Sequence, residues 1–158
     1  MWTLLRRFLA LTALMFWQGG FLFYASVVVP IGQDVLGSHF DQGLITRRVT
    51  VYLNLSGAVA LLVFALDAAL TRDPSRFRRR CRWAVWVGMA ILLALLVWLH
   101  PKLDELIDLD RNRIRNRATF RAGHRWYLWL STVQWGFAIV YAVLMLWSWR
   151  EEDRSDVK

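Results

Sequence analysis

Cysteine is nearly absent from this chain of 158 residues, because Cys81 is the only one. A single cysteine excludes an internal disulfide, and no base stands near it in the sequence, so we interpret Cys81 as a free thiol. The chain also lacks a glycine-rich phosphate loop, a Gly-x-Ser-x-Gly motif and a His-Glu-x-x-His motif. These absences predict that the protein is not an enzyme and carries no cofactor.

Acidic residues are scarce as well. Twelve Asp and Glu stand against twenty Lys and Arg, which leaves a formal net charge of +8. Apolar residues nevertheless make up 57% of the chain, whereas globular chains contain roughly 45–50%. The charges are confined to short arginine-rich stretches between long apolar runs, and this segregation is typical of membrane spans and their loops.

The apolar runs have the length of membrane spans. A bilayer core of roughly 30 Å needs about 20 apolar residues in a helix, and four stretches meet or approach this length, at about residues 8–30, 49–70, 83–100 and 126–149. We read the first as an uncleaved span, because Phe23 is too large for the −3 position of a signal-peptide cut after Ala25. The predicted fold is all-α, an integral membrane four-helix bundle forming one domain over residues 1–150, with a polar C-terminal tail at 151–158.

The distribution of basic residues gives an orientation. Four crossings place both termini and the 71–82 loop on one face, which carries eleven basic residues against nine on the other. Because Lys and Arg concentrate on the cytoplasmic side, both termini are predicted to be cytoplasmic. We interpret the densest group as a topology anchor against anionic lipid headgroups of the bilayer; it contains Arg76, Arg78, Arg79, Arg80 and Arg82. A loop of only about a dozen residues is too short for a nucleic-acid-binding surface.

The segment between the last two spans predicts a helical hairpin outside the membrane. Apolar residues at helical spacing continue the third helix as far as Ile107, with His100, Asp104 and Asp108 on one stripe. A returning helix would present a basic stripe of Arg117, Arg121 and Arg125. Antiparallel arms would pair acid with base and bring His100 near His124. Two interpretations are open: a charge-paired hairpin, or a metal site formed by His100, His124 and Asp104, since zinc and copper accept such ligands.

Polar residues inside the spans gather in the half of the bundle next to this hairpin. Tyr24, Asn54, Ser131 and Gln134 are the main members. They are either interhelical contacts or the wall of a polar vestibule for a small solute or ion. Asp67, the one acid within a span, is expected near the cytoplasmic end, where Arg72 could pair with it.

Several short motifs resemble one known family. Gly19–Tyr24 (GGFLFY) leads to Pro30, Trp98–Pro101 (WLHP) closes the third span, and Phe120 stands four residues before His124. Together they resemble the transmembrane-protein-205-like family, a four-span domain of unknown function linked to tolerance of toxic metal compounds. At three and seven positions after His124, where the resemblance implies small polar residues, this chain has Tyr127 and Ser131, and His100 stands where the family can carry an acid.

The sequence therefore predicts a non-enzymatic multi-pass membrane module that binds or passes a small solute or metal species. The alternative is an interaction or assembly protein, whose polar residues only hold the helices together. A single chain and an oligomer are both compatible with the sequence. Haem is not expected, because His100 and His124 lie at span ends rather than inside the spans.

Overall fold

The computed structural model describes residues 1–108 and 113–156, and within them the chain is all-α apart from one small hairpin. The first long helix comprises α1 (Trp2–Leu14), α2 (Gly20–Phe23) and α3 (Val29–Leu36), joined without a break by two π-helical turns, η1 (Met15–Gly19) and η2 (Tyr24–Val28). The other helices are α4 (His39–Leu70), α5 (Arg76–Asp104) and α6 (Arg117–Asp156). Strands β1 (Ile107–Asp108) and β2 (Arg113–Ile114) pair antiparallel between α5 and α6.

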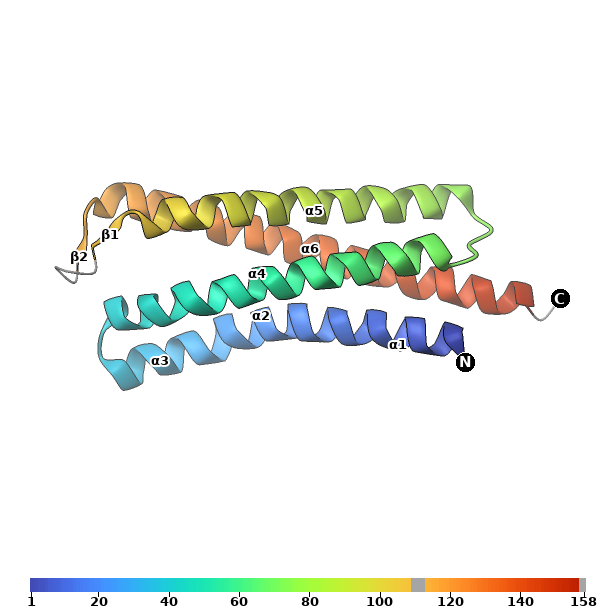
Figure 1. Ribbon diagram of the computed structural model, residues 1–158, viewed down its shortest axis with the longest axis horizontal. Coiled ribbons are helices and arrows are strands. Elements are labelled where there is room, and N and C mark those ends of the chain that lie inside the picture. The colour runs from blue at the N-terminus through green and yellow to red at the C-terminus, as the bar shows by residue number, and fades with distance from the viewer. Residues whose placement is uncertain (109–112, 157–158) are drawn as a thin grey trace.

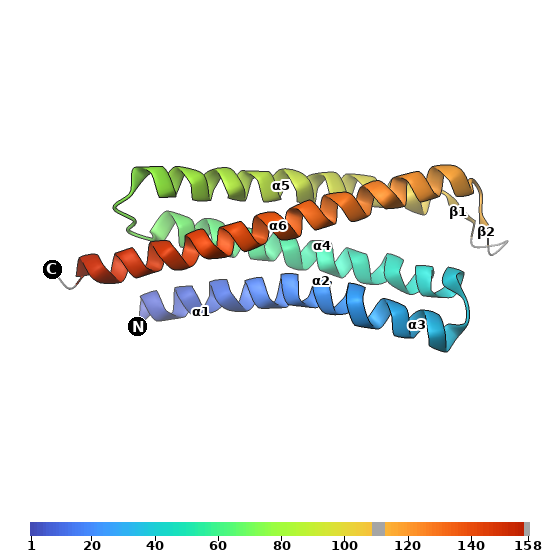
Figure 2. The same ribbon diagram turned by 180° about the vertical axis from the view of Figure 1, so that it is seen from behind.

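Four long helices lie side by side in alternating directions (Figures 1 and 2). The two termini and the α4–α5 turn lie at one end, and the α3–α4 turn and the β1–β2 hairpin lie at the other. The first helix packs on α4, α4 packs on α5, and α5 packs on α6. All four helices are long and apolar enough to cross a membrane, by length and composition, and this agrees with the predicted number of spans.

Local sequence signals set the helix ends. Gly37 adopts a left-handed conformation (φ 59°) that ends α3, and the Ser38 hydroxyl accepts a hydrogen bond from the Asp41 amide at the start of α4. The Ser75 hydroxyl caps α5 in the same way. Pro30 lies inside the first helix directly after η2. Since proline crowds the carbonyl four residues before it, the wider π-helical turn offers a physical reason for the helix to continue through Pro30.

Large apolar side chains face outward along every helix, including Phe8, Leu62, Ile91 and Val140. The interior is a narrow column of mostly aromatic and sulfur-containing side chains, among them Trp17, Phe64, Met89, Tyr141 and Met145. The rings of Phe64 and Tyr141 stack with centroids 4.9 Å apart. A bundle that is apolar on its outside as well as its inside is suited to lipid rather than water.

Two helices end at other residues than the sequence predicts. Helix α5 extends beyond Leu99 but ends at Asp104, so the predicted helical continuation to Ile107 is wrong, and a β hairpin follows instead. Helix α6 continues to Asp156, beyond the predicted end of the domain at residue 150. Glu152 is 5% exposed and lies within the bundle, because arginines on the first helix bind its carboxylate.

Gly57 permits a close approach between the first helix and α4. A Cβ atom at Gly57 would lie 2.7 Å from Nε1 of Trp17, whereas a Cβ at Gly19 would meet nothing within 4 Å. We expect Gly57→Ala to destabilise the protein by about 1–3 kcal/mol through overpacking. The Gly19→Ala control should be neutral or stabilising, because alanine favours the helix. Unfolding in mixed detergent and SDS micelles measures both variants, and equal effects would contradict this packing.

Candidate functional site

A cavity of about 430 Å³ lies between the four helices, in the half of the bundle that holds the α3–α4 turn and the β hairpin. Its wall contains every glutamine and every histidine of the chain, namely Gln18, Gln33, Gln42 and Gln134, and His39, His100 and His124. These residues come from all four helices. Residues far apart in the sequence therefore converge on one polar space inside the bundle.

All four residues predicted to form a polar vestibule line this cavity. The Tyr24 hydroxyl donates a hydrogen bond to Thr46 Oγ1 at 3.0 Å, and the Tyr127 hydroxyl donates to Asn54 Oδ1 at 3.3 Å. Gln134 Nε2 donates to the Met89 carbonyl at 3.2 Å, and the Ser131 hydroxyl donates to the Tyr127 carbonyl. The bonds of Tyr24, Asn54 and Gln134 thus hold neighbouring helices together, whereas the Ser131 bond stays within α6.

The three residues of the predicted metal site line the same cavity, but they are not arranged as a ligand set. Asp104 lies 3.4 Å from Nδ1 of His100 and 2.9 Å from Nε of Arg47. The other ring nitrogen of His100 lies 3.1 Å from the Arg47 carbonyl. His124 instead stacks beside Phe120, with the two rings nearly parallel. Across residues 1–108 and 113–156, no group of three or more His, Cys, Asp or Glu is placed to hold a metal ion.

Arg47 was not anticipated as the partner of Asp104, which the sequence assigned to the basic stripe of the last helix. Arg47 lies on α4, and its guanidinium reaches Asp104 at the end of α5. Asp108 lies 3.7 Å from Arg115, in the connection before α6. Asp104 therefore joins α5 to α4 instead of reaching the predicted basic stripe, while Asp108 and Arg115 still pair acid with base across the hairpin.

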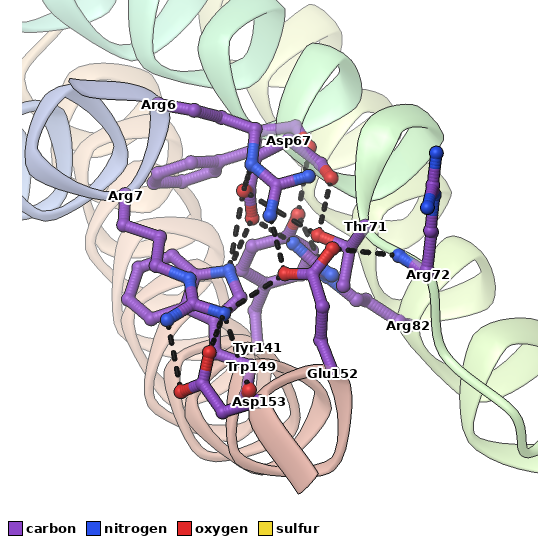
Figure 3. A network of polar contacts seen from close by, with 11 residues as sticks. Arg6, Arg7, Asp67, Thr71, Arg72, Arg82, Tyr141, Trp149, Glu152 and Asp153 are labelled. Atoms are coloured by element: carbon purple, nitrogen blue, oxygen red, sulfur yellow. Dashed lines mark hydrogen bonds and ion pairs between the residues drawn. The ribbon is translucent and has the colours of Figure 1, made fainter. Parts of the chain in front are cut away.

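The opposite end of the bundle contains a second polar feature, a buried network of charged side chains (Figure 3). Asp67 on α4 is fully buried. Its carboxylate pairs with Arg82 of α5 and with Nε of Arg6, at 3.1 Å, on α1. The indole nitrogen of Trp149 on α6 donates to it at 3.1 and 3.2 Å. The predicted Asp67–Arg72 pair is therefore wrong, because the Asp67 side chain points into the bundle.

The network continues through the C-terminal part of α6. Glu152 accepts hydrogen bonds from Arg6 at 2.6 Å, from Arg7 at 2.9 Å and from the backbone amide of Arg72 at 3.0 Å. Arg7 also binds Asp153 through two nitrogens. Tyr141 completes the arrangement, because its hydroxyl accepts from Arg82 and donates to the Phe64 carbonyl. Three arginines thus balance three carboxylates, and the network ties all four helices together.

Two arginines of the predicted topology anchor belong to the interior instead. Arg82 is 2% exposed and pairs with Asp67, and Arg78 is 9% exposed and binds Asp73 through two nitrogens at 2.6 Å. Carboxylates of the protein, not lipid headgroups, are therefore the partners that the structure shows for these two arginines. Arg76, Arg79 and Arg80 are exposed, as an anchor requires.

The Asp73 carboxyl, in the turn between α4 and α5, gives the fold a pH-dependent contact. Burial raises its pKa, but hydrogen bonds from Arg78, Ser148 and the Ser75 amide outweigh burial and hold the pKa below the ordinary 3.8. Because its pKa is lowered, the ionised Asp73 carboxyl stabilises the fold at pH values above its ordinary pKa. This contribution to stability is lost as the pH falls through the lowered pKa. We expect stability to fall less steeply below pH 3.8 in Asp73→Asn than in wild type, measured by thermal unfolding; parallel curves would contradict this.

Some residues of the cavity wall stand out in the sequence but were not among the predicted site residues. His39, Gln33 and Gln42 stand in the polar segment between the first two spans, and the rarity of Gln and His elsewhere in the chain could have drawn attention to them. Arg6 and Glu152 gave no such signal. They are 146 positions apart, and a charge near either terminus ordinarily faces water.

Comparison of the chain with models of protein families, with curated proteins and with solved structures finds no match. The family resemblance drawn from the short motifs therefore has no support from these comparisons. The structure itself defines a class, an all-α bundle of four helices that are long and apolar enough to span a membrane.

Proposed function

We propose that this chain is a four-span integral membrane protein whose polar cavity binds a small solute. One observation carries the proposal: all four glutamines and all three histidines converge on one cavity. Within lipid, polar side chains that face a shared interior space are by default candidates for function. The volume of about 430 Å³ falls in the range of small-molecule sites, roughly 300–1,000 Å³.

The remaining features of the proposal follow from charge. We propose that both termini and the exposed Arg76, Arg79 and Arg80 lie on the cytoplasmic side of the membrane. The cavity then lies in the half of the bundle nearer the opposite side, where the segment between α5 and α6 extends outside the membrane. A metal species is the less favoured solute, since the charged groups of the cavity wall pair with each other. Passage of the solute would require the buried charge network at the other end to open. We therefore propose binding as the primary activity.

The proposal is tested by the reactivity of introduced cysteines. In a Cys81→Ser background, Ser131→Cys places a thiol on the cavity wall, and Ala138→Cys places one two turns further along the same helix, in the packed core. A charged, membrane-impermeant methanethiosulfonate reagent needs water and a thiolate. We expect the first variant to react and the second to stay unmodified. If both are inert in folded protein, the bundle is packed solid and the proposal fails.

One observation favours the rival function, an interaction or assembly protein. The hydroxyls of Tyr24 and Tyr127 and the amide of Gln134 bind neighbouring helices directly, as structural contacts would. This rival predicts an inert thiol in the Ser131→Cys variant. It also predicts a stoichiometric partner that co-purifies with the chain after gentle extraction in detergent.

A further inference from the structure

The polar groups of the cavity wall fall into two sets. One set is engaged with the protein: Tyr24, Asn54, Tyr127, Ser131 and Gln134 all make hydrogen bonds to it. The other set consists of Gln18, Gln33, His39, Thr50 and His124, whose side chains make no hydrogen bond or ion pair within the described part of the chain. Because polar groups in a bundle normally find partners, this second set is available to a ligand.

The available groups are neutral amides, imidazoles and a hydroxyl, which donate and accept hydrogen bonds without a fixed charge. Among the described residues that line the cavity, only Arg47 and Asp104 carry a permanent charge. They lie 2.9 Å apart and neutralise each other. An ionic ligand would lose its hydration without gaining a free counter-charge, and in a protein interior this desolvation is costly. The wall is therefore suited to an uncharged ligand.

The rest of the wall is apolar and partly flat. Trp17 and Phe21 contribute from the first helix, and Phe120 and His124 from α6. The rings of Phe120 and His124 are nearly parallel, with an interplanar angle of 3° and centroids 6.1 Å apart. Two parallel rings one helical turn apart offer aromatic faces, against which a planar apolar group can pack.

Resting on the proposed function, we infer that the ligand is an uncharged amphipathic molecule with a planar ring and a hydrogen-bonding group of the amide type. The ring packs against Phe120 and His124, and the polar group exchanges hydrogen bonds with Gln18 and Gln33. Such a ligand satisfies Gln18 and Gln33 and leaves the Arg47–Asp104 pair closed. Neither an anion nor a cation satisfies both conditions.

Three probes of one shape test this inference: naphthamide, naphthoate and naphthylmethylammonium. Each is titrated calorimetrically into the full-length protein in detergent, with empty micelles as the blank. We expect naphthamide to bind at least about tenfold more tightly than either ion. Gln18→Leu and Gln33→Leu should each weaken naphthamide about tenfold, since each removes one hydrogen-bonding group. Thr132→Val, which removes an exposed α6 hydroxyl outside the cavity, should bind naphthamide as the wild type does.

Three results would overturn the inference: either ion binding as tightly as the amide, no binding of the amide at all, or equal amide binding in wild type and both cavity variants. Gln18 has no protein partner to lose, so Gln18→Leu should keep its folding midpoint, and Gln33→Leu provides a second independent variant. A reactive thiol in the Ser131→Cys variant combined with any of these results would leave the cavity in place and reject the ligand class alone. An inert thiol in the Ser131→Cys variant would reject both the solvent-connected cavity and the ligand class.

Discussion

The Asp67→Asn variant should lose about 3–5 kcal/mol of folding free energy, the loss typical of breaking a buried ion pair by removing one partner. Arg82 is the residue left without compensation. It is 2% exposed, its carboxylate partner is Asp67, and its other contact is the neutral hydroxyl of Tyr141. Arg6 is less affected, because Glu152 also binds it.

Unfolding in mixed micelles of SDS and a mild detergent measures this loss. Asp34→Asn is the matched control, since Asp34 is exposed on α3 and should change stability by less than about 0.5 kcal/mol. Combining Asp67→Asn with Arg82→Gln restores the charge balance and should recover part of the loss. Additive effects of the two substitutions would show that the pair is not coupled, contrary to the network described above.

Replacing Tyr141 by Ala should also cost about 3–5 kcal/mol, because the substitution leaves a cavity at the centre of the bundle. Tyr141 is fully buried. Its ring stacks on Phe64 and lies under the Arg82 guanidinium, 5.3 Å from the ring centroid. The Tyr141→Phe variant keeps the ring and loses the hydroxyl bond to the Phe64 carbonyl, so it should cost about 1 kcal/mol.

Val143→Ala is the control for the Tyr141 variants. Val143 lies on the same helix and is 57% exposed, so in a membrane its side chain would contact lipid. Because lipid chains replace the lost contacts, the substitution should have little effect. A loss at Val143 as large as the loss at Tyr141 would mean that this face of α6 is covered by protein instead.

The two polar features divide the bundle along its length. At the end with the termini, three arginines and three carboxylates close the interior with direct ion pairs. At the other end, the four helices enclose the cavity. Both π-helical turns of the first helix supply cavity residues, Trp17 and Gln18 from η1 and Tyr24 and Ala25 from η2. Since π-helical turns occur frequently at functional sites, their position here agrees with the proposed role of the cavity.

The sequence predicted the helix number and class because run length and hydrophobicity determine them locally. The vestibule residues were also predictable. Tyr24, Asn54, Ser131 and Gln134 are polar within apolar spans, and alternating helix directions place them at one level of the bundle. Predicted and observed helix bounds differ, since charged residues such as Arg76 and Glu152 continue a helix that hydropathy alone would end.

Partner choice was not predictable from the sequence. Asp67 lies 61 positions from Arg6 and 15 from Arg82, and only the rotation of three helices about their axes brings these side chains together. Arg72 is nearer to Asp67 in the sequence and was therefore the predicted partner. It follows the end of α4, however, and its side chain is exposed. Similarly, nothing local distinguishes Arg47 from the arginines of α6 as the partner of Asp104.

The account depends on the four helices crossing a membrane, so that lipid covers their exposed apolar surface. The most direct test fuses a protease-cleavable tag to each end of the chain and exposes sealed vesicles to protease. The termini lie at one end of the bundle (Figure 1), so we predict that both tags are cleaved or both are protected. Cleavage of only one tag in sealed vesicles, or a chain that stays soluble without detergent, would contradict the account.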